Sequence, residues 1–346
     1  MTDKPAVTTP VEKNLTLSLD AMSGDLGAEV VVYAALATLE KHTNVELKII
    51  GDQTELEDLV TTVIGDNPRI QIVHASEVVH MFESPTDALR KKKDSSMRIA
   101  INLVKNNVAD ACVSSGNTGA LMATAKFVLK TSPGIDRPAI IAELPAKGGS
   151  IHMLDLGANT QANANQLFQY AMMGSIVSSD IGGIEKPRIA LLNIGEEDIK
   201  GNDIVKEAAT LLKESTLNYV GFIEGNDLFS GMADVVVTDG FTGNVTLKTI
   251  EGAVGLVHHF LRRAFTRNWF SKLQAILASK VLKSLAKEID ARNYNGAILV
   301  GLNGIVIKSH GGADSIAFQH AIDTAIVEAK KQLPDQIGSL LQEEAQ

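Results

Sequence analysis

The sequence predicts a three-layer α/β protein in which helices cover both faces of a mostly parallel β-sheet. Short runs of aliphatic and β-branched residues alternate nearly throughout with segments whose apolar residues recur at helical spacing. Polar, glycine-containing turns follow many of these runs. Alternation of this kind implies right-handed β-α-β crossovers, which place helices on both faces of a sheet. With 346 residues, 45% of them hydrophobic, the chain can bury a sizeable core.

The order of the elements follows from these runs. The first part of the chain predicts strands at 15–20, 45–51, 70–73 and 111–114, with helices at 29–40, 54–64 and 95–106. The later part predicts strands at 138–143, 151–156, 188–194, 219–223, 234–237, 297–300 and 305–308, before a last helix at 315–332. No internal repeat is visible along this series.

The chain is expected to form one α/β domain over residues 15–333. Residues 1–14 are polar, contain two prolines and carry no apolar signal-peptide core, so we expect a disordered tail. Residues 334–346 are expected to form a second, polar tail. Cys112 is the only cysteine, which suits a reducing cytoplasm, and its apolar strand predicts a buried side chain rather than a nucleophile.

Composition and missing motifs narrow the function. The net charge of -9 argues against a nucleic-acid binder, which needs a positive surface for the phosphate backbone. The dinucleotide motif G-x-G-x-x-G, the phosphate-loop motif G-x-x-x-x-G-K-[ST] and the hydrolase motif G-x-S-x-G do not occur where their chemistry needs them. No histidine and cysteine spacing suits zinc, and we expect neither a metal nor a cofactor.

Six polar, mostly glycine-containing turns follow predicted strands, at 20–25, 114–119, 155–159, 195–203, 238–244 and 309–314. Ligands of parallel α/β sheets bind beyond the carboxyl ends of the strands, so we expect these turns to share one edge and form a substrate cleft. In the turn at 238–244, Gly240 and Gly243 stand where a strand becomes a helix. That is a suitable anion site. The alternative is a plain turn in which Thr242 or Asn244 caps the helix.

The turns, read in order, resemble one known family. They contain Asp20-Ala-Met-Ser-Gly-Asp25, Ser115-Gly-Asn-Thr-Gly-Ala120, Leu154-Asp-Leu-Gly-Ala-Asn159, Gly195-Glu-Glu197, Lys200-Gly-Asn-Asp203, Thr238-Asp-Gly-Phe-Thr-Gly-Asn-Val245 and Ser309-His-Gly311. Together they closely resemble the bacterial PlsX family of acyl-carrier-protein:phosphate acyltransferases, over roughly residues 15–330. Two positions depart from the family, Ser23 for the usual glycine and Ser115 for a common alanine.

The resemblance implies a reaction in which inorganic phosphate attacks the thioester of an acyl-acyl carrier protein, giving acyl phosphate for phospholipid synthesis. It implies a homodimer, no acyl-cysteine, and a fold related to phosphotransacetylases and isopropylmalate dehydrogenases. Such a catalyst must hold the phosphate and stabilise an oxyanion, for which lysine and amide donors suffice. We therefore assign these tasks to Lys200 and Asn244, with a surface lysine in an acidic loop as the alternative for Lys200.

The remaining substrate- and phosphate-binding candidates come from the same turns. Asp20, Asn117, Asp155, Asn159 and Asp239 also admit a purely structural role, since such residues often cap helices. His310 contacts either the ligand or its own loop. The full set of these candidates is Asp20, Gly24, Asn117, Thr118, Gly119, Asp155, Asn159, Asp239, Gly240, Thr242, Gly243 and His310.

Three rival functions remain at this point. The first is a phosphotransacetylase acting on acyl-coenzyme A. The second is a dehydrogenase of the related fold, which the missing dinucleotide motif weakens. The third is a non-catalytic membrane scaffold for lipid enzymes.

Two surfaces predict partners. The basic run at 90–93 suits the acidic carrier protein, with Arg262 and Arg263 as another patch. A protruding amphipathic helical segment is expected at 264–287, where the stretch 252–287 has seven basic residues and no acidic one. It should place the chain peripherally on an anionic membrane, near the downstream glycerol-3-phosphate acyltransferase. Its membrane-contact residues are Phe265, Trp269, Leu273, Ile276 and Leu277. The alternative is a core or dimer-interface helix.

Overall fold

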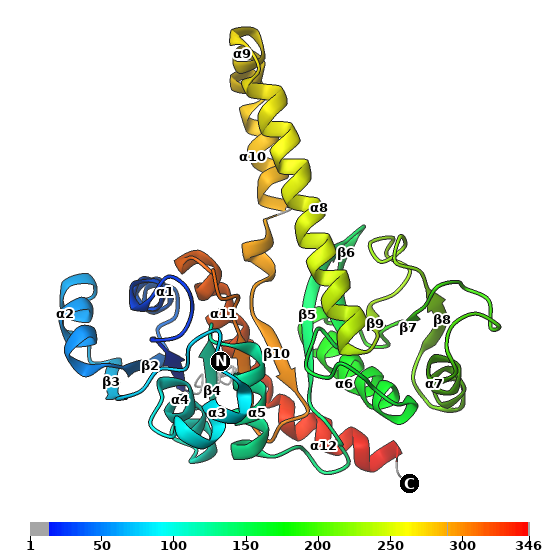
Figure 1. The fold of residues 1–346 in the computed structure, drawn as a ribbon, viewed down its shortest axis with the longest axis horizontal. Coiled ribbons are helices and arrows are strands. Elements are labelled where there is room, and N and C mark those ends of the chain that lie inside the picture. The colour runs from blue at the N-terminus through cyan, green and yellow to red at the C-terminus, as the bar shows by residue number, and fades with distance from the viewer. Residues whose placement is uncertain (1–13, 289, 345–346) are drawn as a thin grey trace, which may run out of the picture.

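The computed structural model describes residues 14–288 and 290–344. Within them the strands form one eleven-stranded sheet in the order β3-β2-β1-β4-β11-β10-β5-β6-β9-β7-β8 (Figure 1). Five strands run parallel in the first half, β3 (Ile70–His74), β2 (Val45–Gly51), β1 (Leu15–Asp20), β4 (Ala111–Ser114) and β11 (Ile305–Lys308). Four run parallel in the second half, β6 (Gly149–Leu154), β9 (Val235–Val237), β7 (Ile189–Leu192) and β8 (Tyr219–Ile223).

Two strands join these halves with antiparallel pairings. β10 (Ala297–Val300) runs antiparallel to β11 and to β5 (Ala139–Ala146), and β5 runs antiparallel to β6. After these three reversals the second half of the sheet points the opposite way from the first. The carboxyl ends of β1, β4 and β11 therefore lie at one edge, called the first edge here. Those of β6, β9 and β7 lie at the opposite, second edge.

The mostly parallel sheet is confirmed, but the single edge expected for all six turns is wrong. The reason is two hairpins that strand-helix alternation does not reveal. Residues 147–148 alone connect β5 to β6, and residues 301–304 connect β10 to β11. Connections this short join antiparallel strands, because a parallel crossover needs a dozen or more residues. Gly148, with φ 86°, supplies the left-handed conformation that the β5–β6 turn requires.

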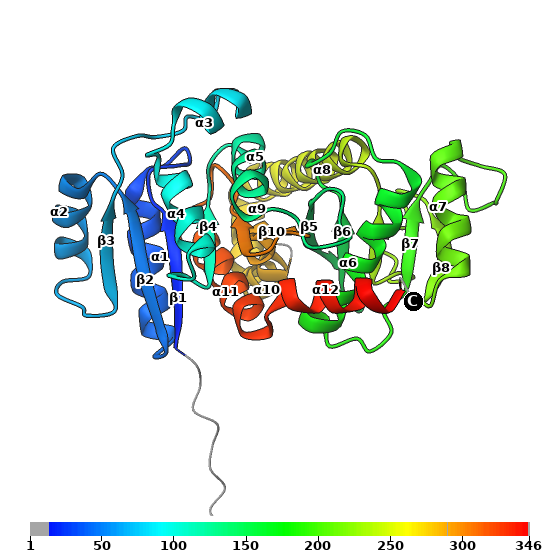
Figure 2. The same ribbon diagram turned by 90° about the horizontal axis from the view of Figure 1, so that it is seen from below.

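Helices cover both faces of the sheet, which confirms three layers (Figure 2). One core contains residues of α1 (Ala28–Lys41), α11 (Ser315–Lys331), α6 (Ala164–Gly182) and α7 (Asp203–Glu214). The core on the other face contains residues of α4 (Ser96–Lys105) and α5 (Thr118–Leu129), with α8 (Gly240–Thr266) packed against it. Cys112 is fully buried in this second core, as expected, and burial raises the pKa of its thiol.

Smaller helices complete the body. α2 (Gln53–Val63) packs beside α1 and β3, and α3 (Pro85–Lys91) packs on α5. The C-terminal residues expected as a polar tail instead form α12 (Leu333–Glu344), which packs against α6. Leu333 and Ile337 are each 2% exposed, and their four-residue spacing attaches this helix to the core. Nearly all of the expected N-terminal tail lies outside the described residues.

Three helices extend away from the body (Figure 1). α8 is 27 residues long, and α9 (Trp269–Leu277) and α10 (Ser279–Glu288) follow it before the short 3₁₀ helix η1 (Ala291–Tyr294). We call α8 beyond residue 251, α9 and α10 the projection. Apolar side chains along it are exposed, among them Val257 at 54% and Trp269 at 77%. No helix in the described part of the chain is long and apolar enough to span a bilayer.

Candidate active site

Three polar residues end neighbouring strands at the first edge. Asp20 ends β1, Ser114 ends β4 and Lys308 ends β11, and the strand register pairs Ser114 with both of the others. The Ser114 hydroxyl donates a hydrogen bond of 2.6 Å to Oδ2 of Asp20. Asp20 is fully buried, and its Oδ1 has no partner among the described residues. A buried carboxylate oxygen without a partner is costly and often marks a functional position.

Lys308 is a further candidate that the sequence motifs did not indicate. Only 9% of it is exposed, and its Nζ donates to the carbonyl oxygens of Ser115 and Ser309. Burial, and after it the charge of Lys248 on α8, lower the pKa of Lys308 to about 8, although Asp20 and Asp25 partly oppose this shift. The available signal was a lysine that ends an otherwise apolar strand directly before a glycine turn.

The turns at the first edge are packed tightly together. Gly24 has φ 99°, and a Cβ there would lie 2.5 Å from Oγ of Ser115, so only glycine fits. The Ser115 hydroxyl donates to the carbonyl of Ser23 at 2.8 Å, and the Asp25 amide donates to the carbonyl of Gly311 at 2.8 Å. The two serines that depart from the family pattern therefore contact each other.

His310 and Asn117 differ in whether their side chains keep a hydrogen-bonding group for a ligand at this edge. The backbone N–H of Gly312 donates to His310 Nδ1 at 3.1 Å, so a neutral ring carries its proton on Nε2. This loop contact leaves the Nε2–H of an exposed side chain as a further donor. Asn117 is committed to structure, because it caps α5 through the Ala120 amide and donates to the carbonyl of Met81 at 2.6 Å. Thr118 is exposed at the start of α5.

Gly119 packs against α3. A Cβ at Gly119 would lie 2.9 Å from Cγ of Pro85. The glycine therefore lets the start of α3 approach the first turn of α5.

At the second edge, Asp155 organises a turn. Oδ1 accepts from the amides of Ile140, Gly157 and Ala158, and Oδ2 accepts from the amide and side chain of Asn159, all between 2.8 and 3.2 Å. Asn159 also donates to the carbonyl of Pro138 at 2.8 Å. Both side chains are buried. Their hydrogen bonds are used within the protein, which favours a structural role over ligand contact.

Helix α8 begins on that turn. Asp239 is its N-cap and accepts from the amide and hydroxyl of Thr242, each at 2.9 Å, so neither of the expected caps is correct. A Cβ at Gly240 would lie 2.5 Å from the carbonyl oxygen of Asn159, and one at Gly243 would collide with that of Asp155. The close approach expected of these glycines therefore occurs, but to the protein's own backbone.

Asn244 and Lys200 are exposed at the second edge. Nδ2 of Asn244 donates to the carbonyl of Leu156 at 3.1 Å. Lys200 lies in the loop after β7, where its side chain packs over Gly195. Asn193 closes this loop by donating to the carbonyls of Gly195 and Lys200 at 3.0 and 3.3 Å. Since β9 lies between β6 and β7, the three turns of this edge are neighbours.

Helix α8 connects the two edges. Its first turn lies against the Asp155 turn, through a hydrogen bond of 2.8 Å from the Gly240 amide to the carbonyl of Asn159. Two turns further along, Lys248 lies close enough to Lys308 to lower its pKa. The structure therefore brings the candidates together as two clusters joined by α8, rather than as one row of turns.

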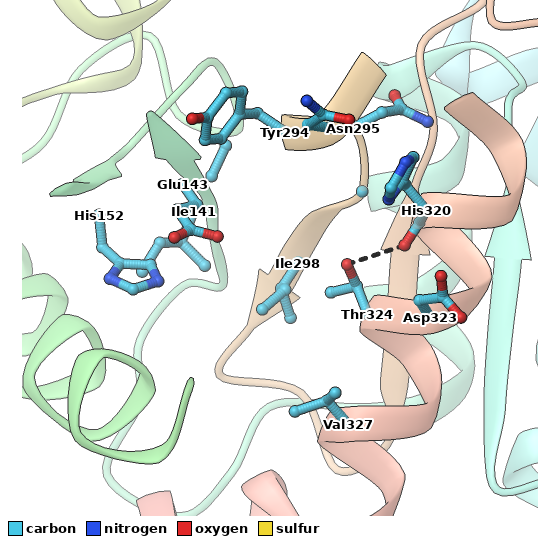
Figure 3. Close-up of a pocket in the computed structure, with 13 residues that line it drawn as sticks. Ile141, Glu143, His152, Tyr294, Asn295, Ile298, His320, Asp323, Thr324 and Val327 are labelled. Atoms are coloured by element: carbon cyan, nitrogen blue, oxygen red, sulfur yellow. Dashed lines mark hydrogen bonds between the residues drawn. The ribbon is translucent and has the colours of Figure 1, made fainter. Parts of the chain in front are cut away.

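A separate cavity of about 180 Å³ lies between the sheet and α11 (Figure 3). Its walls include Glu143 and His152 from β5 and β6, and His320 and Thr324 from α11. His152 is 3% exposed, and burial lowers its pKa. None of the predicted site residues lines this cavity. In the described ranges, no group of three or more His, Cys, Asp or Glu could hold a metal ion.

Comparison with known proteins settles the family. The model of a family described as "Fatty acid synthesis protein" matches residues 15–336. The chain belongs to this family. Among its relatives are phosphate acyltransferases of Nitrosococcus oceani and Alkalilimnicola ehrlichii, 56% and 54% identical, each covering 95% of this chain and 97% of the relative. The expected PlsX membership is confirmed, and the chain is an acyltransferase of fatty acid and phospholipid synthesis.

Solved structures confirm the fold. A phosphotransacetylase from Streptococcus pyogenes aligns with a TM-score of 0.60 at 20% identity, covering 92% of this chain and 94% of that one. The EutD phosphotransacetylase from Staphylococcus aureus aligns with a TM-score of 0.58 at 18% identity and the same coverage. The acyltransferase family is thus built on the phosphotransacetylase fold expected from the motifs.

Proposed function

We propose that this acyltransferase moves a fatty acyl group from acyl carrier protein to inorganic phosphate, giving acyl phosphate for phosphatidic acid synthesis. The observation that carries the proposal is the pairing of lysines and amide donors at the two edges with a sole cysteine that is fully buried. A buried thiol whose pKa is raised cannot serve as an acyl carrier. Direct attack of phosphate on the thioester needs no acyl-cysteine intermediate.

The proposed mechanism relies on positioning and charge. Phosphate is partly dianionic at neutral pH, so it needs little help from a general base. Lys200 and Asn244, exposed on neighbouring turns of the second edge, would orient the anion and stabilise the tetrahedral oxyanion. Asp155, Asn159 and the helix cap Asp239 would act indirectly, by holding those turns in place.

The geometry refines the proposed phosphate contacts. A carboxylate beside a dianion is repulsive, and Asp155 and Asp239 already accept hydrogen bonds from their own turns. We therefore place phosphate contact on lysines, backbone N–H groups and His310 rather than on the aspartates. Gly24, Gly240 and Gly243 would serve by letting the turns pack closely. Thr118 and Thr242 remain polar candidates at the starts of two helices.

One experiment tests the function. Palmitoyl-carrier protein is incubated with the enzyme, with and without phosphate, and acyl phosphate is sought by mass spectrometry. We expect thioester loss that depends on phosphate and yields acyl phosphate. Faster reaction with palmitoyl-coenzyme A would favour the phosphotransacetylase alternative. Absence of turnover on both thioesters would favour a scaffold, and NAD binding would favour a dehydrogenase.

The proposed enzyme works as a homodimer on an anionic membrane surface, beside the downstream glycerol-3-phosphate acyltransferase. Val254, Val257 and Leu261 of α8 recur at helical spacing and are 41%, 54% and 37% exposed, which favours coverage by a second copy. Sedimentation of the intact chain tests this dimer.

The far end of the projection supports the membrane part of the proposal. Trp269, Ile276 and Leu277 are 77%, 68% and 79% exposed, and Leu273 is 44% exposed. Basic residues surround them, each able to contribute about 1 kcal/mol at an anionic surface. An acyl phosphate is amphiphilic, so release beside a bilayer suits its chemistry.

A further inference from the structure

Lys308 has the geometry of a reacting group rather than of a structural cation. An ammonium has three N–H donors, and two of those of Lys308 go to carbonyl oxygens. No carboxylate in the described residues forms an ion pair with it. The carboxyl groups that favour its protonated form are those of Asp20 and Asp25, which raise its pKa without forming an ion pair with it. One N–H remains for a substrate.

The surroundings of Lys308 allow a substrate to approach. The strand level that Lys308 shares with Asp20 and Ser114 is buried, and so are Ser115 and Ser309 directly after it, whereas residues further along two of the turns reach solvent. Asp25 and His310 are exposed, and Gly24 and Gly311 carry no side chains. A thioester that reaches the end of β11 would enter past these exposed side chains.

The proposed reaction leaves one demand that the phosphate-binding residues do not meet. When phosphate attacks the thioester carbon, the C–S bond breaks and a thiolate leaves. Hydrogen phosphate brings one proton, and the product thiol needs one at its sulfur. A proton donor at the sulfur would lower the barrier, as general acids do by about 10²- to 10⁴-fold.

We propose that Lys308 is the catalytic general acid that protonates the leaving sulfur, with Asp20 and Ser114 as its positioning residues. This inference rests on the proposed function, and it requires the reacting thioester to lie between the two edges, beside the part of α8 that carries Asn244 and Lys248. The phosphate oxygen forms the new C–O bond as the C–S bond breaks. The Nζ proton passes to sulfur, and the neutral amine then takes the proton that hydrogen phosphate brought. Atoms and charge balance without any further reactant.

The electrostatics of the site suit this role. An alkyl thiol such as that of cysteine titrates near about 8.5. With a pKa lowered to about 8, Lys308 is mostly protonated at neutral pH and is matched to the thiol it would serve. An ordinary lysine near 10.5 would give up its proton less readily. The charged groups that face Lys308 are Asp20 of β1, Asp25 of the following turn and Lys248 of α8.

The test varies the leaving group. Lys308→Met and Lys308→Arg are assayed on the carrier thioester and on an aryl thioester of the same acyl chain, whose more acidic thiol needs no proton donor. We expect Lys308→Met to lower kcat on the carrier thioester by about 10²-fold or more, with little change in KM for phosphate or in the aryl reaction. Arginine keeps the charge but does not release a proton, so Lys308→Arg should not restore the rate.

Other outcomes would overturn the proposal. Equal loss on both thioesters with a raised KM for phosphate would make Lys308 a phosphate-binding cation. Restored turnover in Lys308→Arg would assign only a charge, and full turnover in Lys308→Met would assign no role. If the wild-type enzyme forms no acyl phosphate, the proposed function itself fails, which separates the two failures.

Two controls guard against misfolding. Methionine matches the length of the buried stem without its charge, so the melting temperature of Lys308→Met should not fall. Lys105→Met, at an exposed lysine ending α4, is the matched variant and should behave as wild type. A pH profile adds an independent readout. Wild-type kcat on the carrier thioester should fall as pH rises through about 8, where Lys308 loses its proton, and this limb should be absent in Lys308→Met.

Discussion

The two edges of the sheet use the same residue types for different purposes. At the second edge, Asp155 accepts five hydrogen bonds from its own turn and from Ile140. At the first edge, Asp20 is equally buried but accepts one, from Ser114, and the hydroxyl of Ser23 is also unpartnered among the described residues. A carboxylate whose two oxygens both accept hydrogen bonds stabilises the fold. A carboxylate that keeps an oxygen without a donor, beside a buried lysine, is available for chemistry.

The largest effect on stability or turnover is expected when Asp155 and Asp20 are each substituted in a separate variant. Asp155→Ala leaves four backbone amides without their acceptor, two of them buried and two partly buried, so we expect a loss of about 3 kcal/mol or more in the free energy of unfolding. Asp20→Asn keeps the shape and should change stability little while lowering turnover, because Lys308 loses a favourable charge. Denaturant unfolding and steady-state kinetics on both variants give the comparison. A reversed pattern would show that the hydrogen bonds do not separate structure from chemistry.

The second prediction concerns Lys200 and Asn244, the pair proposed to act in catalysis at the second edge. Lys200→Ala should lower turnover by roughly 10²-fold while the protein stays folded, as loss of one oxyanion donor does elsewhere. Asn244→Ala should lower it less, because Asn244 already donates to the carbonyl of Leu156. Kinetics with circular dichroism as the folding control measure both. Near-normal turnover in folded Lys200→Ala protein would leave Lys200 as the surface lysine of an acidic loop.

The third prediction contrasts the projection with the body. Trp269→Glu combined with Leu273→Glu should abolish flotation with anionic liposomes and preserve turnover on soluble carrier substrate. The reason is that both side chains are exposed at the far end, away from either edge. Val108→Glu replaces an exposed apolar residue of the body and should float as wild type does. A double variant that still floats, or that becomes monomeric or unfolds, would contradict membrane contact.

The sequence predicted the strands more accurately than their arrangement. The ranges expected for β1, β2, β4, β8, β10 and β11 match the structure residue for residue, because apolar runs between polar turns mark buried strands. The reversal between β10 and β11 was missed, although the four residues between the expected strands 297–300 and 305–308 are too few for a parallel crossover. The antiparallel pairing of β10 with β5 could not be predicted, because these strands are far apart in the sequence. The separation of the six turns onto two edges follows from these strand directions.

The site was predicted in outline for a similar reason. Motifs locate turns, but they do not say whether Asp155 or Asp20 keeps a free oxygen, since that depends on amides far along the chain such as that of Ile140. Lys308 was not predicted as a site residue, because a lysine at a strand end is normally exposed. Only the packing of β11 between β4 and β10 shows that its ammonium is buried.

The smallest expected effect concerns docking of the carrier protein beside the first edge. Of the four basic residues at 90–93, Lys91 pairs with Asp87 at 2.6 Å and Lys92 lies 3.9 Å from Glu83, whereas Arg90 and Lys93 are exposed. Arg90→Glu with Lys93→Glu should therefore raise KM for the acidic carrier several-fold more than Lys91→Glu does, since the charge of Lys91 is partly balanced by Asp87.

The rise in KM should shrink as salt screens the charges, because the Debye length falls to about 8 Å at physiological ionic strength. Lys105→Glu, at the end of α4, makes the same charge change as each of these single substitutions and serves as the control. Turnover on a small pantetheine thioester should stay at the wild-type value, because nothing acidic then needs to dock. If KM for the carrier is unchanged at low salt, docking belongs to the second candidate patch, Arg262 and Arg263 on the projection.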